Sequence, residues 1–112
     1  FDAVINNTDR KIGHLLPITE DQVLGCDHGV TFHEEDKLRT VLWQWADKAL
    51  SNSEVEQLTE LEASLRTSSE ELLALITENE FDALLARINA LLKNATFPTP
   101  SDEWPAVPWP PF

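Results

Sequence analysis

Two aspartates in the first quarter of the chain are of the residue type that metal-dependent phosphoryl transfer requires. Asp9 lies in the run Asn6–His14, and Asp27 follows 18 residues later; each is expected where a short strand gives way to a loop. This chemistry needs one carboxylate to orient the acceptor hydroxyl and a second to hold a divalent cation on the nucleotide phosphates. The two aspartates are therefore candidates for a phosphotransfer site.

The order of the neighbouring residues follows a known catalytic pattern. In H-R-D-x-x-x-x-N a metal-binding residue comes five positions after the catalytic Asp, and a D-F-G triplet comes later. Here the fifth position after Asp9 is His14, and the later triplet is Asp27-His28-Gly29. The spacing thus matches that pattern, with histidine in place of asparagine.

Three runs together resemble a known family. The chain is similar to an uncharacterised actinobacterial family related to phosphatidylinositol 3- and 4-kinases and to HipA-like kinases. The resemblance covers residues 1 to about 50 closely and the helical remainder loosely. The runs that carry it are Asn6–His14, Gly25–Val30 and Phe32–Trp43.

The resemblance implies a role for each polar residue. Asp9 would be the catalytic Asp, and Asp27 and His14 would hold Mg²⁺ or Mn²⁺ with ATP. Lys11 would either meet a phosphate or be an ordinary solvated lysine. Because Mg²⁺ prefers oxygen ligands, the imidazole of His14 either shifts the preference toward Mn²⁺ or leaves His14 as a hydrogen-bonding neighbour.

The simpler interpretation of the first motif is a surface turn. Asn-Thr-Asp is ordinary turn chemistry, so Asp9 and Arg10 alone would not indicate a site. The matching Asp27-His28-Gly29 favours the catalytic interpretation, because two motifs coincide in order. Asn6 and Asn7 are expected to be turn formers whose side chains hydrogen-bond within the loop.

A structural zinc site is the alternative metal centre. His14, Cys26, His28 and His33 are nitrogen and sulfur ligands of the kind that zinc prefers. In an extended stretch, however, Cys26 and His28 share one face and Asp27 lies on the other, and the chain has no C-x-x-C pair. The sequence therefore argues against zinc and favours Cys26 as a core residue.

The expected fold class is α+β and mostly α-helical, with a small N-terminal hairpin packed on three to four helices. Strands are predicted at 3–5, 15–18 and 23–26, with a hairpin tip near 21–22. Helices are predicted at 34–46, from Asn52 or Ser53 to Arg66, from Ser68 or Ser69, and over 80–94. If Ser53 is the cap of the second helix, Glu56 is placed for a capping box. The apolar set expected inward on the later helices includes Leu73, Leu75, Leu84 and Ile88.

Domain organisation follows from the same pattern. Residues 1–96 are predicted to be a partial kinase-like C-terminal lobe, made of a catalytic and metal-loop hairpin (1–33) and a helical part (34–96). Residues 97–112 form a Pro/Trp-rich tail that holds every proline except Pro17. Trp104, Trp109 and Phe112 are expected either to pack back on the body or to form a docking peptide.

The segment before this tail adds two expectations. The acids of His33–Lys37 suit a helix N-terminus, and Glu35 could pair with Arg39 one turn later. Trp43 and Trp45 cannot both face inward on one helix, so one of them is expected to cover a partner surface.

Charge and composition limit the partners. The chain of 112 residues has 8 basic and 20 acidic residues, a net charge of −12, which disfavours nucleic acid and anionic membrane surfaces. It has no apolar run of the roughly 18 residues that span a bilayer. A single cysteine fits a cytoplasmic location.

Two functions from different classes follow. The first is the catalytic C-terminal lobe of an ATP-dependent phosphotransferase with an alcohol acceptor. No Gly-rich loop or V-A-I-K-like strand is present, so this lobe is expected to be inactive without an N-terminal lobe of the same protein. The second is a non-catalytic kinase-like helical module that binds another protein through Trp43 or the tail. Self-association is expected through an apolar surface near Trp43, Trp45 or Phe32.

Overall fold

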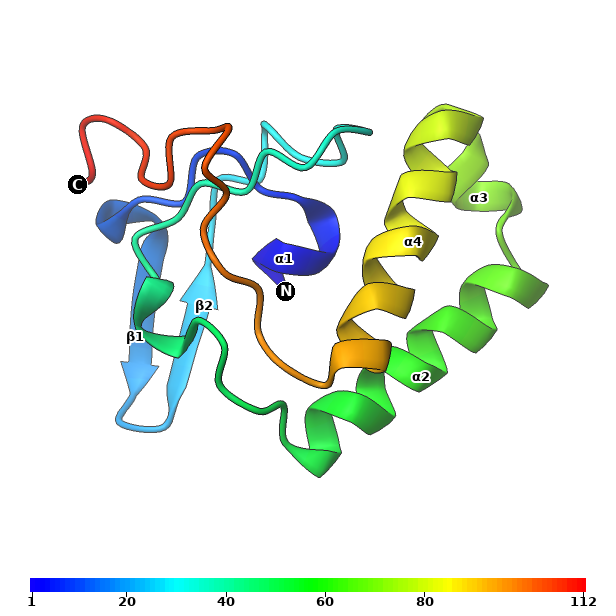
Figure 1. The fold of residues 1–112 in the computed structure, drawn as a ribbon, viewed down its shortest axis with the longest axis horizontal. Coiled ribbons are helices and arrows are strands. Elements are labelled where there is room, and N and C mark those ends of the chain that lie inside the picture. The colour runs from blue at the N-terminus through cyan, green and yellow to red at the C-terminus, as the bar shows by residue number, and fades with distance from the viewer.

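The computed structural model describes all 112 residues, and its single sheet is the predicted hairpin. Strands β1 (Leu15–Thr19) and β2 (Gln22–Gly25) pair antiparallel around a turn at 20–21. Leu16 lies opposite Leu24, and Pro17 lies opposite Val23. Every residue of the hairpin except Leu15 is exposed, so the sheet lies beside the body rather than inside it (Figure 1).

Two long helices form the other side of the molecule. Helix α2 (Asn52–Thr67) begins at Ser51, whose hydroxyl accepts from the amide of Glu54, while the Glu54 carboxylate accepts from the amide of Ser51. Helix α4 (Glu78–Asn94) begins at Thr77 with the same reciprocal bonds to Glu80. Each pair of reciprocal bonds is a capping box, which gives hydrogen-bond partners to two amides that have none within the helix. The predicted caps of α2 at residues 52 or 53 lie one or two residues too late.

Helix α3 (Glu70–Leu73) is a single turn between them, with Ser69 before it as predicted. Because the turn ends at Leu73, the next residues do not continue an inward stripe. Leu73 is 37% exposed and Leu75 is 81% exposed. The prediction that both face the core is therefore wrong.

The apolar core joins α1 (Asp2–Ile5) to the long helices. Val4 and Ile5 of α1 pack with Leu65, Leu84 and Ile88, and all five are buried. The prediction of a strand at 3–5 is wrong. The carbonyl of Phe1 accepts from the amides of Val4 and Ile5, and packing against α4 outweighs the strand preference of β-branched side chains.

The predicted helix at 34–46 is also wrong. The segment has only a 3₁₀ turn, η2 (Trp43–Trp45), because its backbone pairs with the N-terminal loop instead of with itself. The amide of Arg10 donates to the carbonyl of Arg39, the amide of Val41 donates to that of Arg10, and the amide of Arg39 donates to that of Asn7. These long-range bonds replace the bonds of a helix.

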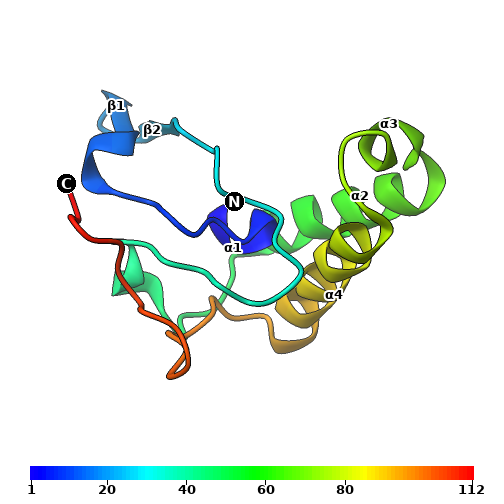
Figure 2. The same cartoon turned by 90° about the horizontal axis from the view of Figure 1, so that it is seen from above.

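The tail returns across this irregular segment toward the hairpin side of the molecule (Figures 1 and 2). Trp104 is half-buried and Pro108 is fully buried, so the prediction that the tail packs on the body is confirmed for this part. It is wrong for Trp109 and Phe112, which are 85% and 79% exposed. Among the helices of the chain, none combines the length and apolar character that crossing a membrane requires.

Candidate functional site

The loop that carries the first aspartate is a buried polar structure. Asn6, Asn7, Thr8 and Arg10 are each at most 5% exposed. Asn6 has left-handed backbone (φ 56°), which asparagine tolerates better than most residues, and this ends α1. Buried polar groups are costly unless they are hydrogen-bonded, so the partners of these side chains determine the shape of the loop.

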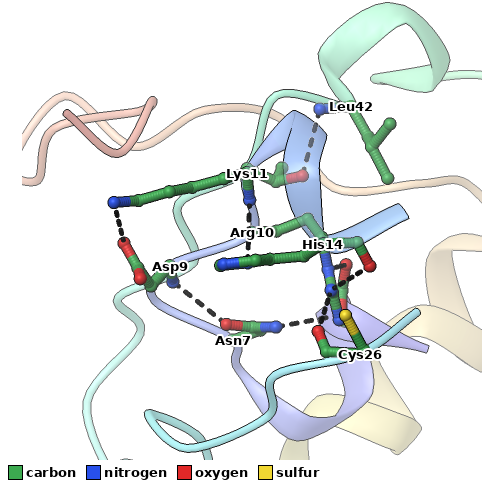
Figure 3. Close-up of polar contacts among 9 residues, drawn as sticks. Asn7, Asp9, Arg10, Lys11, His14, Cys26 and Leu42 are labelled. Carbon is green, nitrogen blue, oxygen red and sulfur yellow. Dashed lines mark hydrogen bonds and ion pairs between the residues drawn. The ribbon is translucent and has the colours of Figure 1, made fainter. Parts of the chain in front are cut away.

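Asn6 and Asn7 hold the loop from two sides. Asn6 donates through Nδ2 to the carbonyls of His33 (3.0 Å) and Glu35 (2.6 Å), and its Oδ1 accepts from the amide of Lys37 (2.9 Å). Asn7 accepts through Oδ1 from the amide of Asp9 (3.0 Å), as Figure 3 shows. The predicted roles of both asparagines as loop formers are confirmed.

Arg10 ties the loop to the hairpin. Its Nε and Nη2 donate to the two carboxylate oxygens of Asp2, at 2.8 and 2.9 Å. Its Nη1 donates to the carbonyl of Cys26 (2.6 Å) and to that of His14 (3.3 Å) (Figure 3). His14 precedes β1 and Cys26 follows β2, so one guanidinium binds the residues that enter and leave the hairpin at its open end.

The pair of Asp2 and Arg10 is strong because it is largely shielded from water. Burial would raise the pKa of the Asp2 carboxyl, but hydrogen bonds from Arg10 and Asn7 and the charge of Arg10 hold that pKa below its usual value. The pKa of Arg10 is raised by its hydrogen bonds to Asp2, against the opposing effect of burial. Both groups therefore stay charged at neutral pH.

Gly25 makes room for this guanidinium at the end of β2. A Cβ at position 25 would lie 3.2 Å from Nη2 and 3.4 Å from Cζ of Arg10. Any larger residue would therefore press on the group that binds the open end of the hairpin.

Asp9 itself remains accessible. Its side chain is 34% exposed, and Lys11 Nζ lies 3.9 Å from Oδ1, too far for a hydrogen bond (Figure 3). The loop thus presents a carboxylate and an ammonium group side by side, with no hydrogen bond that would occupy the carboxylate.

Asp27, the second aspartate, lies against His14, the histidine predicted from the motif spacing. His14 Nε2 is 3.3 Å from Asp27 Oδ2, although the two residues are 13 apart in sequence. His14 Nδ1 accepts from the amide of Lys11 at 3.4 Å, so in the neutral imidazole the proton is on Nε2 and points to Asp27. Asp27 is 61% exposed and has left-handed backbone, with φ 58°. Such conformations occur more often at functional sites.

The four residues considered for zinc do not form a site. No three His, Cys, Asp or Glu side chains gather in a way that could hold a metal ion. The ring of His28 contacts that of Phe1 edge-on at 5.3 Å, and His33 Nδ1 accepts from the amide of Glu35. Cys26, which was expected in the core, is only half-buried because it lies at the end of the exposed hairpin.

Several contacts of this region were not foreseen. The predicted pair of Glu35 and Arg39 is wrong: without the helix, Glu35 pairs with Lys37 at 3.5 Å, and Arg39 Nε donates to the carbonyl of Thr8 at 2.6 Å. Trp43 donates through Nε1 to the carbonyl of Ala106.

The structural roles of Asp2 and Arg10 were also missed. Asp2 and Arg10 belong to no common helix or strand, because α1 ends at Asn6 between them, so no single period relates the two positions. The one sequence signal is the position of an arginine directly after the candidate catalytic Asp.

Exposed apolar side chains are more numerous on the hairpin than at the predicted positions. Of those positions Trp45 is exposed, at 45%, whereas Trp43 is half-buried and Phe32 packs against the apolar core. The exposed set on and beside the hairpin is Ile12, Leu16, Ile18, Val23, Leu24 and Val30, each at least 45% exposed.

The chain is similar to a known protein over its full length. The chain is 42% identical over 113 residues to protein Rv2133c of Mycobacterium tuberculosis, a match that covers all of this chain. The chain spans 40% of the length of that relative. No protein-family profile matches the chain, and no solved structure gives a significant match.

Proposed function

We propose that the chain is the C-terminal catalytic lobe of an ATP-dependent phosphotransferase that uses an alcohol group as acceptor. The observation that supports this most is the position of Arg10. It follows Asp9 directly and binds the carbonyls of His14 and Cys26, the residue before Asp27. One buried side chain thereby fixes the two motifs relative to each other, as a two-carboxylate site requires.

Asp9 is suited to orient an acceptor hydroxyl. Its carboxylate is accessible, and the amide of Asp9 is held by Asn7 so that the turn is fixed. Lys11 lies beside it and offers positive charge to a phosphate group, which is where charge develops during the transfer.

Asp27 is the residue that would hold Mg²⁺ or Mn²⁺ with ATP. A bound cation would neutralise charge on the nucleotide phosphates. The exposed carboxylate of Asp27 fits this requirement. His14 fits better as a donor that orients Asp27 than as a second ligand, because its Nδ1 already accepts a hydrogen bond and its Nε2 faces Asp27 Oδ2.

The N-terminal lobe of the same protein would complete the nucleotide site. The relative from Mycobacterium tuberculosis extends well beyond the matched region, which leaves room for such a lobe. The exposed side chains of Leu16 and Leu24 form a cross-strand pair on the hairpin that leads to Asp27. We propose that this apolar surface is covered by nucleotide or by the N-terminal lobe, and that the protein is cytoplasmic.

The alternative is a non-catalytic kinase-like module that binds another protein. The exposure of Trp109 and Phe112 at the end of the tail favours it, because large aromatic side chains are typical anchors of protein interfaces. In this case the polar loop would only support the tail.

Calorimetric titration of the native full-length protein with ATP and Mn²⁺ or Mg²⁺ distinguishes the two. Asp27→Asn should abolish metal-dependent nucleotide binding, and Asp9→Asn should retain binding and abolish transfer of radiolabelled phosphate. Asp82→Asn, at an exposed position of α4, is the matched control and should change neither. Unchanged nucleotide binding in Asp27→Asn would refute the assignment, and the 112-residue chain alone should show no transfer.

A further inference from the structure

Trp104 is a tail residue that the proposed site does not use, and its surroundings connect it to Asp9. We infer that Trp104 is a positioning residue for the Asp9 loop, acting through Arg39. This inference rests on the proposed phosphotransferase function for its effect on turnover. Its effect on the loop itself can be measured without that function.

Two cations lie over the indole. Lys37 Nζ is 4.9 Å and Arg39 Cζ is 5.6 Å from the centre of the Trp104 ring. Both distances are within the range of cation–π attraction, in which the electron-rich face of the ring holds a cation. The half-buried Trp104 therefore limits the positions that the guanidinium of Arg39 can adopt.

Arg39 in turn holds the residues just before Asp9. Its Nε donates to the carbonyl of Thr8 at 2.6 Å, and its amide donates to the carbonyl of Asn7 at 3.0 Å. A hydrogen bond from a charged donor is roughly twice as strong as one between neutral groups. A shift of Arg39 would consequently move the peptide that leads into the candidate catalytic carboxylate.

The tail backbone holds the other side of the loop. Prolines at 105, 108, 110 and 111 have no amide donor, so this stretch acts mainly through its carbonyls. Ala106 accepts from the amide of Thr40 (3.0 Å) and from Trp43 Nε1 (2.8 Å), and Pro111 accepts from the amide of Ile12 (2.9 Å). The loop is thus held at residue 8 through Arg39 and at residue 12 by the tail directly.

The indole acts through its ring face and not through its polar atom. Trp104 Nε1 is buried and has no hydrogen-bond partner, which is unfavourable for a tryptophan kept only for packing. In addition, Trp104 neither belongs to the apolar core nor packs against it, since that core consists of residues from α1 to α4 and Phe32. Loss of the ring should consequently affect the loop more than the helical body.

Variants of the native full-length protein test the inference. Trp104→Leu removes the ring face, whereas Trp104→Phe keeps it and removes only the unpartnered N–H. Trp109→Leu is the matched control, since Trp109 is 85% exposed in the same tail. Arg39→Lys retains a cation near the ring and removes the Nε donor to Thr8. It therefore tests the same chain of contacts without altering the tail.

Hydrogen exchange of the backbone amides from Asp9 to Ile12 is the first measurement. Trp104→Leu and Arg39→Lys should each speed exchange there, while exchange in α4 stays unchanged; Trp104→Phe and Trp109→Leu should match the parent. Turnover is the second measurement. The two disruptive variants should lower kcat about 10- to 100-fold with little change in the KM for ATP, as expected when a reacting group is misplaced by a fraction of an ångström to an ångström.

The outcomes separate the two proposals. If the parent protein shows no phosphotransfer, the exchange data still decide whether Trp104 positions the loop. Unchanged exchange from residue 9 to 12 in Trp104→Leu would overturn the inference. Equal effects of Trp104→Leu and Trp104→Phe would also overturn it, because the ring face would then not be the feature that matters.

Discussion

Replacing Arg10 with methionine should be far more destabilising than the same change at any exposed arginine. Arg10 is 1% exposed and makes four side-chain hydrogen bonds. Methionine keeps much of the length and apolar stem but leaves the shielded carboxylate of Asp2, which is 17% exposed, without its cation. Removing one partner of a buried ion pair typically costs about 3–5 kcal/mol.

That cost is large against the whole stability of a domain of this size. Domains are typically stable by about 5–15 kcal/mol, so Arg10→Met should remove about a fifth or more of the free energy of unfolding. With a urea dependence of about 1–3 kcal/mol per molar, the unfolding midpoint should fall by roughly 2 M. Helical circular dichroism reports α2 and α4. Fluorescence reports the four tryptophans, all of which lie outside those helices.

Arg66→Met is the matched control. Arg66 Nε lies 2.9 Å from Glu62, nearly the same distance as Arg10 Nε from Asp2, but Arg66 is 55% exposed. A solvated pair one helical turn apart contributes about 0.3–0.5 kcal/mol. Equal midpoint shifts for the two variants would refute the argument that Arg10 and Asp2 form a polar core.

Three further perturbations have defined outcomes. His14→Ala should weaken metal-dependent ATP binding about ten-fold by calorimetry, with Mg²⁺ and Mn²⁺ alike, because it removes the imidazole that faces and orients Asp27; unchanged affinity would contradict this. Asp2→Asn should flatten the acid dependence of stability: the folded pKa of Asp2 is depressed, so its contribution is complete above the ordinary value of 3.8 and is lost as the pH falls through the folded pKa. The urea midpoints of parent and variant should therefore converge in acid, and parallel curves would count against the assignment. Ile88→Ala, at a 0% exposed position, should cost about 2–5 kcal/mol, while Leu75→Ala, at 81% exposure, should stay within about 0.5 kcal/mol; similar midpoints would show that the core is wrongly located.

The parts of the fold that follow from local signals could be predicted from the sequence. The hairpin and α4 were found because short apolar runs around turn residues and leucines at helical spacing are properties of neighbouring residues. The start of α2 was placed slightly late, since the sequence offers Ser51, Asn52 and Ser53 as adjacent candidate caps.

The parts that failed depend on distant contacts. Residues 34–46 have a helical apolar period, but their backbone groups bond with the loop at residues 7–10 instead. The same holds at the candidate site. Asp9, Asp27 and His14 could be selected from motif spacing, and the structure brings His14 and Asp27 together. The charge pair that supports them could not be selected, because Asp2 and Arg10 meet only after α1 turns back at Asn6.

The single helical turn α1 contributes residues both to the buried polar loop and to the apolar core. Asp2 at its start binds Arg10 and the polar loop, whereas Val4 and Ile5 lie in the apolar core with α4. Because one four-residue turn supplies side chains to both, a displacement of α1 moves its contacts with the polar loop and with the apolar core together. A mutation in the apolar core between α1 and α4 should therefore also alter the aspartate loop. A change at an exposed position of α4 should leave that loop unchanged.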